Sequence, residues 1–559
     1  MHILSLLPEL TVVIFSHLVR VDPPQASHTG MRLGWINVTH VCRNWREVAL
    51  DYPLLWTELS GELGPRWLDA FFQRSQECLV TLNKFDYYHN RVRLLDKLLP
   101  PTLHRIQNLT IEQTPSRYVR ALLTSRPAPE LREFHFICRH AETEPFIAYL
   151  EMDTSTSTLP ELFAGDAPRL QKLTLHHVCF FPWNSSAIAG LTSLRLTYVK
   201  LSAWETREII SSLQRMWRLE EFYLHCYAHA VTGLPPSITN VVELEKLKCL
   251  SIEADHTLFH YVYRHIRHPR ATRLLLTSSM QDQTHSGDHG VDGILALLLS
   301  HPSHRSMEDY KTIGLNPGSG SRSSLRIQCW EEEFPLTTQN LPDPPFVLTM
   351  ADRSTAPDAP FGDVRKQILS ALRFPNARTL YLHARNGLLN VELTTATAHL
   401  PSVSILSITC GRDENPEDAR MTLLPLGQVP THTRPLLPNL QTLAFPLEHY
   451  GLMSAVGDKY DMKTTGNSML EDLRRFVVNR QRLGVPLRAL YLHPSTLRAS
   501  PSSDPSSVPS ELADIMPIHE RSQRAGDVGP QSSHRHIDYR LVMRWIVERC
   551  DILPLRGTR

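Results

Sequence analysis

Histidine and cysteine are the residues of this sequence whose types and spacing could hold a metal ion. The stretch 176-HHVC-179 and the pair His225-Cys226 both combine the two residue types. Structural zinc sites need two ligand pairs at spacings such as C-x-x-C or H-x-x-x-H, and neither cluster has a second pair. The histidines of 258-LFHYVYRHIRHP-269 lack the glutamate and the spacing of the H-E-x-x-H helix of zinc hydrolases. We therefore interpret these residues as structural or surface groups and expect no metal and no cofactor.

Motifs of covalent or nucleotide chemistry are absent from the sequence. It contains no G-x-S-x-G nucleophile elbow, no P-loop and no dinucleotide-binding glycine pattern. The run 331-EEE-333 is more typical of a solvated face than of a metal cluster. A cysteine nucleophile whose base is distant in the sequence stays open, but no local pattern favours one. We therefore expect a protein that is not an enzyme.

The composition is that of a folded chain without a strong charge preference. The chain has 559 residues, 42% of them hydrophobic, and its net charge is +1. No overall field therefore attracts nucleic acid or an anionic membrane. The nine cysteines stand singly and never as C-x-x-C, which favours free thiols in a reducing compartment.

The apolar N-terminus, 1-MHILSLLPELTVVIFSHLVR-20, could be taken for a secretory signal. It lacks a basic first segment, and Pro8 and His17 interrupt its apolar run. No small-residue cleavage site follows, so we reject this interpretation. No later apolar run approaches the roughly 18 residues that span a bilayer. We expect a soluble intracellular protein of the cytoplasm, the nucleus or both, with no membrane or nucleic-acid partner.

The elements that must position functional residues follow from a recurring apolar pattern, L-x-x-L-x-L. It starts at Ile106, Leu131, Leu170, Leu191, Leu219, Leu247, Ala271, Ala377, Val403, Leu440 and Leu487. Most intervals between neighbouring starts in the first half lie in the leucine-rich-repeat range of roughly 20–29 residues. The last four residues of the pattern alternate, which predicts a short strand with one buried face. Helical returns such as 204-WETREIISSLQRM-216 separate the strands.

Such units cannot bury a strand alone, so they stack side by side. The predicted fold class is α/β: an irregular leucine-rich-repeat solenoid with parallel strands on its concave face. The solenoid is predicted to span residues 101–495, with loop insertions near 278–324 and 409–438. Strand-like 325-LRIQCW-330 and 346-FVLTM-350 interrupt it. A helical linker is expected at 61–100, a disordered Ser/Pro-rich segment at 496–534 and a C-terminal helix at 535–559.

The first sixty residues have a different pattern, which predicts three short helices. In 6-LLPELTVVIFSHL-18, Pro8 suits a first helical turn and Glu9 complements the helix dipole there. Apolar residues then recur at helical spacing along this segment. The dense stretch 35-WINVTHVCRNWREVALDYPLLW-56 continues the spacing until Pro53. The predicted unit, residues 1–60, is too small to build a large core by itself.

These two segments together resemble the F-box, in the F-box-like form of basidiomycete fungal proteins. The family pattern reads L-P-P-E-I-L-x-x-I-F-x-H-L, then W-x-x-V-x-x-V-C-R-x-W-R-x-x-A-x-x-x-P-x-L-W. The matching residues are Leu6, Pro8, Glu9, Leu10, Ile14, Phe15, His17, Leu18, Trp35, Val38, Val41, Cys42, Arg43, Trp45, Arg46, Ala49, Pro53, Leu55 and Trp56. Leu7 replaces the first proline and Thr11 replaces an aliphatic residue, which could weaken docking. The irregular leucine-rich repeats that follow are also typical of these proteins.

The resemblance implies a substrate receptor of an SCF-type ubiquitin ligase. The F-box would dock onto a Skp-type adaptor, and through it onto a cullin scaffold, while the repeats bind an unknown target protein. The mechanism is proximity, because the receptor holds the target near the charged conjugating enzyme and makes no bonds itself. A few apolar anchors dominate such docking. The anchors we expect are Leu7, Pro8, Leu10, Ile14, Phe15, Val41, Trp45 and Leu54. For Ile14 and Trp45, a role in the internal core is an equally weighted alternative.

Target binding is expected on the strand face opposite the buried leucines. The side chains predicted to lie there are His135, Lys172, Thr174, His176, Arg195, Tyr223, His225, Tyr381, His383, Tyr491 and His493. Tyrosine and histidine are frequent among them and suit recognition surfaces. The preference of tyrosine for strands explains the same enrichment without any binding role.

Two further hypotheses stay open at this point. The chain could be a non-catalytic repeat scaffold that acts outside the ligase and holds its F-box vestigially. A hydrolytic enzyme on a repeat scaffold is the less favoured third hypothesis, because no catalytic motif supports it.

Overall fold

The structure of the chain is a computed structural model. In it the chain forms two compact units, Met1–Thr272 and Arg273–Arg559. It describes residues 6–27, 30–86, 99, 101–112, 126–137, 161–176, 181–198, 201, 203–226, 241–280, 291–317, 324–334, 341–352, 361–383, 390–409, 435–446, 472–473 and 475–493. The predicted segments 496–534 and 535–559, and nearly all of the predicted insertion near 409–438, lie outside this range. Within it, no helix has the length and apolarity to cross a membrane.

The first unit begins with helices. They are α1 (Pro8–Val21), the 3-10 helix η2 (Gly34–His40), α2 (Arg43–Asp51), the 3-10 helices η3 (Pro53–Trp56) and η4 (Gly61–Leu63), and α3 (Pro65–Arg74). A short hairpin of β1 (Gln25–Ser27) and β2 (Gly30–Arg32) joins α1 to η2. The predicted first helix is confirmed, with Pro8 at its start and Glu9 in its first turn. The second predicted helix is divided, because Cys42 leaves the helical conformation between η2 and α2.

A parallel sheet follows in the first unit, in the strand order β3 to β9 and then β11. Its strands are β3 (Glu58–Ser60), β4 (Val80–Asp86), β5 (Ile106–Glu112), β6 (Glu133–Ile137), β7 (Lys172–His176), β8 (Ser193–Tyr198), β9 (Glu221–Cys226) and β11 (Cys249–Asp255). Strands β3 and β4 lack the predicted pattern. Strand β5 begins at a pattern start, and each of the other strands begins two residues after one. The prediction of parallel strands at these positions is confirmed.

The register explains why the pattern repeats. Phe134, Leu173, Leu194 and Phe222 are direct partners on neighbouring strands and are all buried. Each strand therefore contributes the same position to one continuous apolar layer, as in stacked repeats. Polar residues alternate with this layer on the opposite face of the sheet.

A turn also recurs in front of the strands. The backbone N–H of Leu131 donates to the carbonyl of Ala128 at 3.1 Å, and that of Leu219 donates to Met216 at 3.0 Å. Equivalent bonds precede Leu170, Leu247 and Leu440. The first leucine of the pattern therefore closes a turn that starts each strand, which its sequence position alone did not predict.

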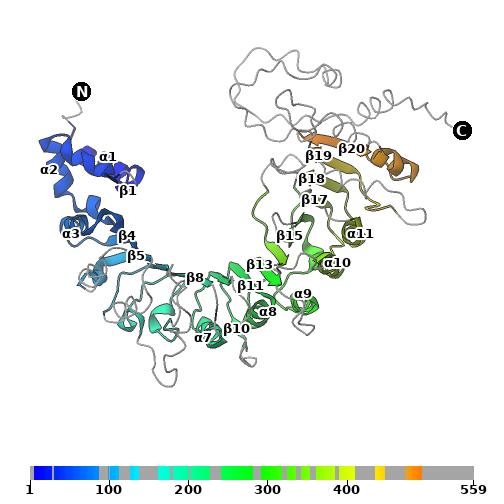
Figure 1. Cartoon of the computed structure of the whole chain (residues 1–559), viewed down its shortest axis with the longest axis horizontal. Coiled ribbons are helices and arrows are strands. Elements are labelled where there is room, and N and C mark those ends of the chain that lie inside the picture. The colour runs from blue at the N-terminus through cyan, green and yellow to red at the C-terminus, as the bar shows by residue number, and fades with distance from the viewer. Residues whose placement is uncertain are drawn as a thin grey trace, which may run out of the picture. The chain divides into compact units, whose positions relative to one another are not determined.

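The remaining elements of the first unit are helices, 3-10 turns and a small strand pair. They are η5 (Leu103–Arg105), η7 (Leu162–Gly165), η8 (Ser186–Ile188), α7 (Ala203–Leu213), β10 (Val242–Glu243), α8 (His256–Arg264) and β12 (Ile266–Arg267). Figure 1 shows α7 and α8 on the same side of strands β8 and β11. Asp255 ends β11 and caps α8, because its carboxylate accepts from the backbone N–H groups of Thr257 and Leu258 at 2.9 and 3.1 Å.

The second unit is also mixed α/β with a mostly parallel sheet, in the order β20-β19-β18-β17-β14-β15-β16-β13. Its strands are β13 (Arg273–Met280), β14 (Thr312–Pro317), β15 (Ser324–Trp330), β16 (Phe346–Asp352), β17 (Thr379–His383), β18 (Ile405–Thr409), β19 (Thr442–Pro446) and β20 (Ala489–His493). Its helices include α9 (Val291–Ser300), η9 (Met307–Asp309), α10 (Phe361–Ala371) and α11 (Asn390–Ala398). Strand β15 runs antiparallel to both of its neighbours.

Two boundary predictions are corrected by these elements. The segment 61–100, expected to be a helical linker, contains α3 but also β4, which pairs with β5 in the sheet. The insertion expected as loops near 278–324 contains α9 and β14. Strand β14 is central, pairing with β15 and β17, so its short 312-TIGLNP-317 sequence depends on these neighbours for its conformation.

Candidate protein-binding surfaces

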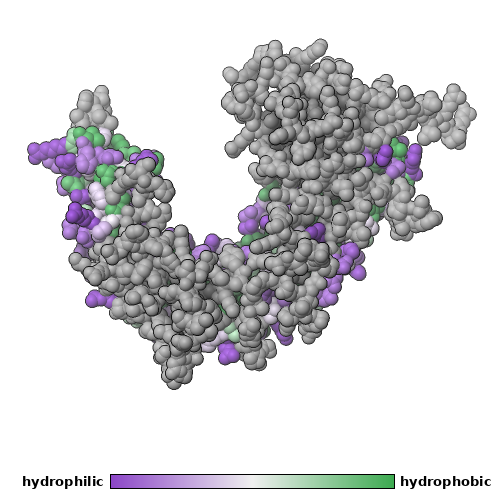
Figure 2. All heavy atoms as spheres, viewed as in Figure 1, coloured by the Kyte–Doolittle hydropathy of each residue, from purple (hydrophilic) through white to green (hydrophobic). Residues whose placement is uncertain are grey.

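Large apolar side chains are exposed on the N-terminal helices. Leu7, Leu10 and Ile14 lie at i, i+3 and i+7 on α1 or its cap, so they share one side of the helix. Their exposed fractions are 64%, 52% and 42%, and two further expected anchors, Val41 and Leu54, are exposed at 58% and 56%. Figure 2 shows hydrophobic residues at the surface of this part of the chain. Leu7, Leu10, Ile14, Val41 and Leu54 are called the exposed apolar set below.

Sequence reasoning missed one residue of this surface. Val13 is 66% exposed and lies three residues after Leu10. Its helical spacing was the available signal, but the family pattern leaves this position unspecified. Pro8 is also exposed and occupies the first turn of α1, where its missing N–H leaves no bond unmade.

A neighbouring side of α1 is buried and corrects one expected anchor. Phe15 has no exposed surface and meets Trp45 edge-on, with ring centroids 5.4 Å apart. Phe15 therefore belongs to the interior and has no surface to offer a partner. Trp45 is half-buried by this contact, so for it the core alternative is the better description, whereas Ile14 lies at the surface. Thr11, one of the two departures from the family pattern, is buried, and its hydroxyl donates to the Leu7 carbonyl at 3.2 Å, so it does not alter the surface.

The C-R-x-W part of the motif organises the start of α2. The Cys42 thiol group accepts from the backbone N–H of Trp45 at 3.4 Å and so acts as the helix cap. Arg46 donates to the carbonyl of Thr39 at 2.6 Å, which ties α2 to η2. Arg43 forms an exposed ion pair with Glu47 at 2.8 Å. These contacts fix the start of α2, directly after Val41 of the exposed apolar set.

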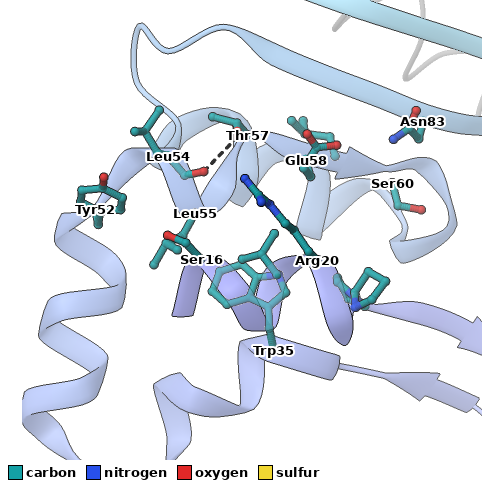
Figure 3. A pocket seen from close by; sticks show the side chains of 14 residues that line it. Ser16, Arg20, Trp35, Tyr52, Leu54, Leu55, Thr57, Glu58, Ser60 and Asn83 are labelled. Atoms are coloured by element: carbon teal, nitrogen blue, oxygen red, sulfur yellow. Dashed lines mark hydrogen bonds between the residues drawn. The ribbon is translucent and has the colours of Figure 1, made fainter. Parts of the chain in front are cut away.

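A groove of about 610 Å³ lies beside the exposed apolar set, where α1, η3 and β3 meet. Figure 3 shows Arg20 extending from α1 into this groove, between Leu54 and Glu58. Burial raises the pKa of the Glu58 carboxyl, and a hydrogen bond with Thr81 opposes this effect. The groove thus contains one cation and one carboxylate, with Leu54 shared between it and the exposed apolar set.

The strand face of the first unit is polar, and three rows of paired residues define it. The first row is Glu58, Thr81, Asn108, Glu133, Lys172, Ser193, Glu221 and Cys249. The second is Thr110, His135, Thr174, Arg195, Tyr223 and Ser251. The third, counted from β5 onward, is Glu112, Ile137, His176, Thr197, His225 and Glu253. This polar face brings together seven of the eleven residues that the sequence predicted for target binding.

Contacts between neighbouring strands fix several side chains of the polar face. Arg195 pairs with the Glu221 carboxylate at 3.3 Å, and its guanidinium lies 4.1 Å from the centre of the Tyr223 ring. Lys172 pairs with Glu133 at 2.7 Å. Burial, followed by a hydrogen bond with Cys249, raises the pKa of Tyr223 to about 12, so its hydroxyl keeps its proton. The face therefore offers preorganised ion pairs and a phenol.

The remaining four expected target residues belong to the second unit: Tyr381 and His383 on β17, and Tyr491 and His493 on β20. Tyr381 and Tyr491 lie in one row there, joined through Ser407 and Ala444 on the strands between them. Gly314 precedes Tyr381 in this row, so the small residues Ser407 and Ala444 are the ones between the two tyrosine positions. The structure therefore divides the predicted target residues into two faces of different chemistry.

Several of the histidines considered as metal ligands contact other protein groups in the structure. Among the residues it describes, no group of three or more His, Cys, Asp or Glu side chains could hold a metal ion. His225 is within 3.0 Å of the Ser251 hydroxyl, and the Nδ1 atoms of His265 and His268 lie 2.6 and 3.0 Å from backbone carbonyls. These contacts occupy ring nitrogens that a metal would need.

One pH prediction arises from the polar face. Burial lowers the pKa of His135 below its ordinary 6.5, and Glu133 opposes this effect through its charge and a hydrogen bond. Because the folded state binds the proton less readily than the unfolded state, His135 should reduce stability as the pH falls below about 6.5. The substitution Glu133→Gln should lower the pKa of His135 further. Proton NMR titration of the labelled imidazole measures it, with Glu130→Gln as the control, and a rise in the midpoint would contradict this assignment.

No protein-family model and no curated protein matches this sequence.

Proposed function

We propose that the chain is the substrate-recognition subunit of an SCF-type ubiquitin ligase. In this proposal residues 1–60 are an F-box that docks onto a Skp-type adaptor, and the adaptor links the chain to a cullin scaffold. The parallel strands that follow are an irregular leucine-rich-repeat solenoid, whose polar face binds a target protein. The chain makes and breaks no bonds, and it acts by holding the target near the conjugating enzyme.

The observation that carries the proposal is the exposure of apolar side chains at the positions that the F-box-like pattern assigns to docking. Leu7, Leu10 and Ile14 are each at least 42% exposed, while Phe15 on the same helix is fully buried. A helix that only needed to close a core would turn its leucines inward, because exposed apolar surface costs free energy. Apolar residues clustered on one exposed side are typical of a protein-binding surface.

Two features support the repeat part of the proposal. Every start of the L-x-x-L-x-L pattern lies at a described strand, and the two later apolar positions of the pattern are buried in strands β5 to β9. The turn closed by the first leucine recurs in both units. Both features are expected of stacked repeats that share one apolar layer.

Co-purification with a Skp-type adaptor tests the proposal. The full chain, co-expressed with an affinity-tagged adaptor, should elute with it as a stoichiometric complex in size-exclusion chromatography. A folded chain that fails to capture the adaptor would overturn the ligase assignment and favour the alternative, a non-catalytic repeat scaffold outside the ligase. Proteomic comparison of cells with and without the chain then identifies targets whose abundance rises in its absence.

A further inference from the structure

We propose that the polar face of the first unit binds a basic segment of the target, rich in lysine and arginine and lying in extended conformation. The inference deepens the proposed function, from which it takes the existence of a target protein. It names the chemistry of that target at the point of contact. The groups that carry it are the carboxylates and cations of the three strand rows.

The first argument is the balance of charge on the polar face. Its acidic residues are Glu58, Glu112, Glu133, Glu221 and Glu253, and its basic residues are Lys172 and Arg195. Five carboxylates and two cations give a formal charge of −3 with neutral histidines, on a chain whose total charge is +1. The negative potential is therefore a local property of this face, which the overall composition hides.

The second argument is that both cations are already neutralised within the face. Lys172 pairs with Glu133 at 2.7 Å, and its hydrogen bond, as the largest contribution, lowers the pKa of that carboxyl. Arg195 is held by Glu221 and by the ring of Tyr223. An acidic partner would have to displace these ion pairs, whereas a basic partner can add to the existing carboxylates. The same charge balance disfavours the phosphates of a nucleic acid.

The third argument concerns dimensions. Glu112 on β5 and Glu253 on β11 are half-buried and lie in the third row, on the first and last of six neighbouring strands. At a strand spacing of about 4.8 Å the row measures on the order of 24 Å, which an extended segment of about seven residues can follow. His176 and His225 lie between the two carboxylates and can add hydrogen bonds. A bound segment could thus place a cation at each end.

Fluorescence anisotropy with defined peptides tests the inference on the full chain. The probe is a labelled twelve-residue peptide of Gly, Ser and Tyr with four Lys or Arg residues, and its counterpart has Glu at those four positions. The basic peptide should bind at least about tenfold more tightly, and its affinity should fall with rising salt. A twelve-nucleotide single-stranded DNA should bind no better than the acidic peptide. Equal binding of the two peptides, or preferred binding of the DNA, would overturn the inference.

Matched variants locate the binding. The pair Glu112→Gln and Glu253→Gln should weaken the basic peptide by on the order of tenfold, since two carboxylate–cation contacts are lost. The pair Glu112→Asp and Glu253→Asp retains the charge and should bind more tightly than the Gln pair. The control pair Glu243→Gln and Glu245→Gln changes the net charge equally outside the three rows and should leave the affinity unchanged. If the control weakens binding as much as the face variant, the assignment to this face fails.

Adaptor capture separates this inference from the proposed function. A chain that captures the adaptor but shows no preference for the basic peptide overturns only the inference. A chain that behaves as expected with the peptides but never captures the adaptor overturns the ligase assignment, and the peptide preference of the face stands. Circular dichroism on each variant, with melting curves equal to those of the parent chain, shows that lost binding is not lost folding.

Discussion

The double substitution Leu10→Asp and Ile14→Asp abolishes adaptor capture, with an expected loss of affinity of at least about a hundredfold. Both side chains are exposed on the same side of α1, at 52% and 42%. In the free chain they pack against little, so the folded state loses little when they become charged. In the docked state each carboxylate would enter an apolar interface without a partner, and that desolvation is costly. Isothermal titration with the purified adaptor measures the change.

The control for this variant lies on the same helix. Val21→Asp introduces the same charge at the last residue of α1, on a side chain that is 65% exposed. Val21 lies outside the exposed apolar set because it is seven residues, or about two helical turns, beyond Ile14. It should retain capture within about threefold of the parent chain, which corresponds to less than about 1 kcal/mol. If Val21→Asp abolishes capture as the double variant does, charge on α1 rather than loss of the anchors explains the effect. If the double variant binds normally, the exposed apolar set is not the docking surface.

The substitution Trp56→Ala is expected to lower the free energy of unfolding by about 3–5 kcal/mol. The Trp56 ring is fully buried, with centroids 4.9 Å from those of both Trp35 and Phe71. Its indole N–H donates to the carbonyl of Ala49 at 2.8 Å, and Arg74 covers the ring at 4.2 Å. Its removal opens a cavity at the junction of η3, α2 and α3, and it leaves a buried carbonyl without its donor.

Hydrogen exchange monitored by mass spectrometry measures this loss on peptides from residues 8–74. Trp217→Ala is the matched control, because that indole is 57% exposed and lies at the surface near Arg218 and Lys246. We expect the control to change stability by less than about 1 kcal/mol, since little apolar surface is lost and surface cation–π contacts are weak. Similar exchange in the two variants would show that the aromatic cluster around Trp56 does not hold the N-terminal helices together.

Local sequence determined the strands that carry the L-x-x-L-x-L pattern and most of the N-terminal helices. The alternation at the end of each L-x-x-L-x-L pattern requires only that one face of the strand is apolar. Leu173 and Leu175, for example, are therefore recognisable as strand residues without knowledge of the neighbouring strands. Pro8 and Glu9 likewise mark the start of α1 through local backbone chemistry. The elements that were missed depend on long-range pairing. Strand β4 lacks the pattern and is held by β3 and β5, and β14 is held by β15 and β17.

In the candidate surfaces too, the sequence identified some features and only the tertiary structure decided others. The sequence alone identified the apolar residues of α1, since their types and spacing are local. Only the tertiary structure decided that Leu10 faces solvent while Phe15 packs on Trp45, because helical spacing fixes relative directions and not which side is covered. Likewise, Glu133 and Lys172 stand far apart in the chain, and only the register of β6 and β7 makes them an ion pair. The charge of the polar face is therefore a property of strand pairing, which composition cannot express.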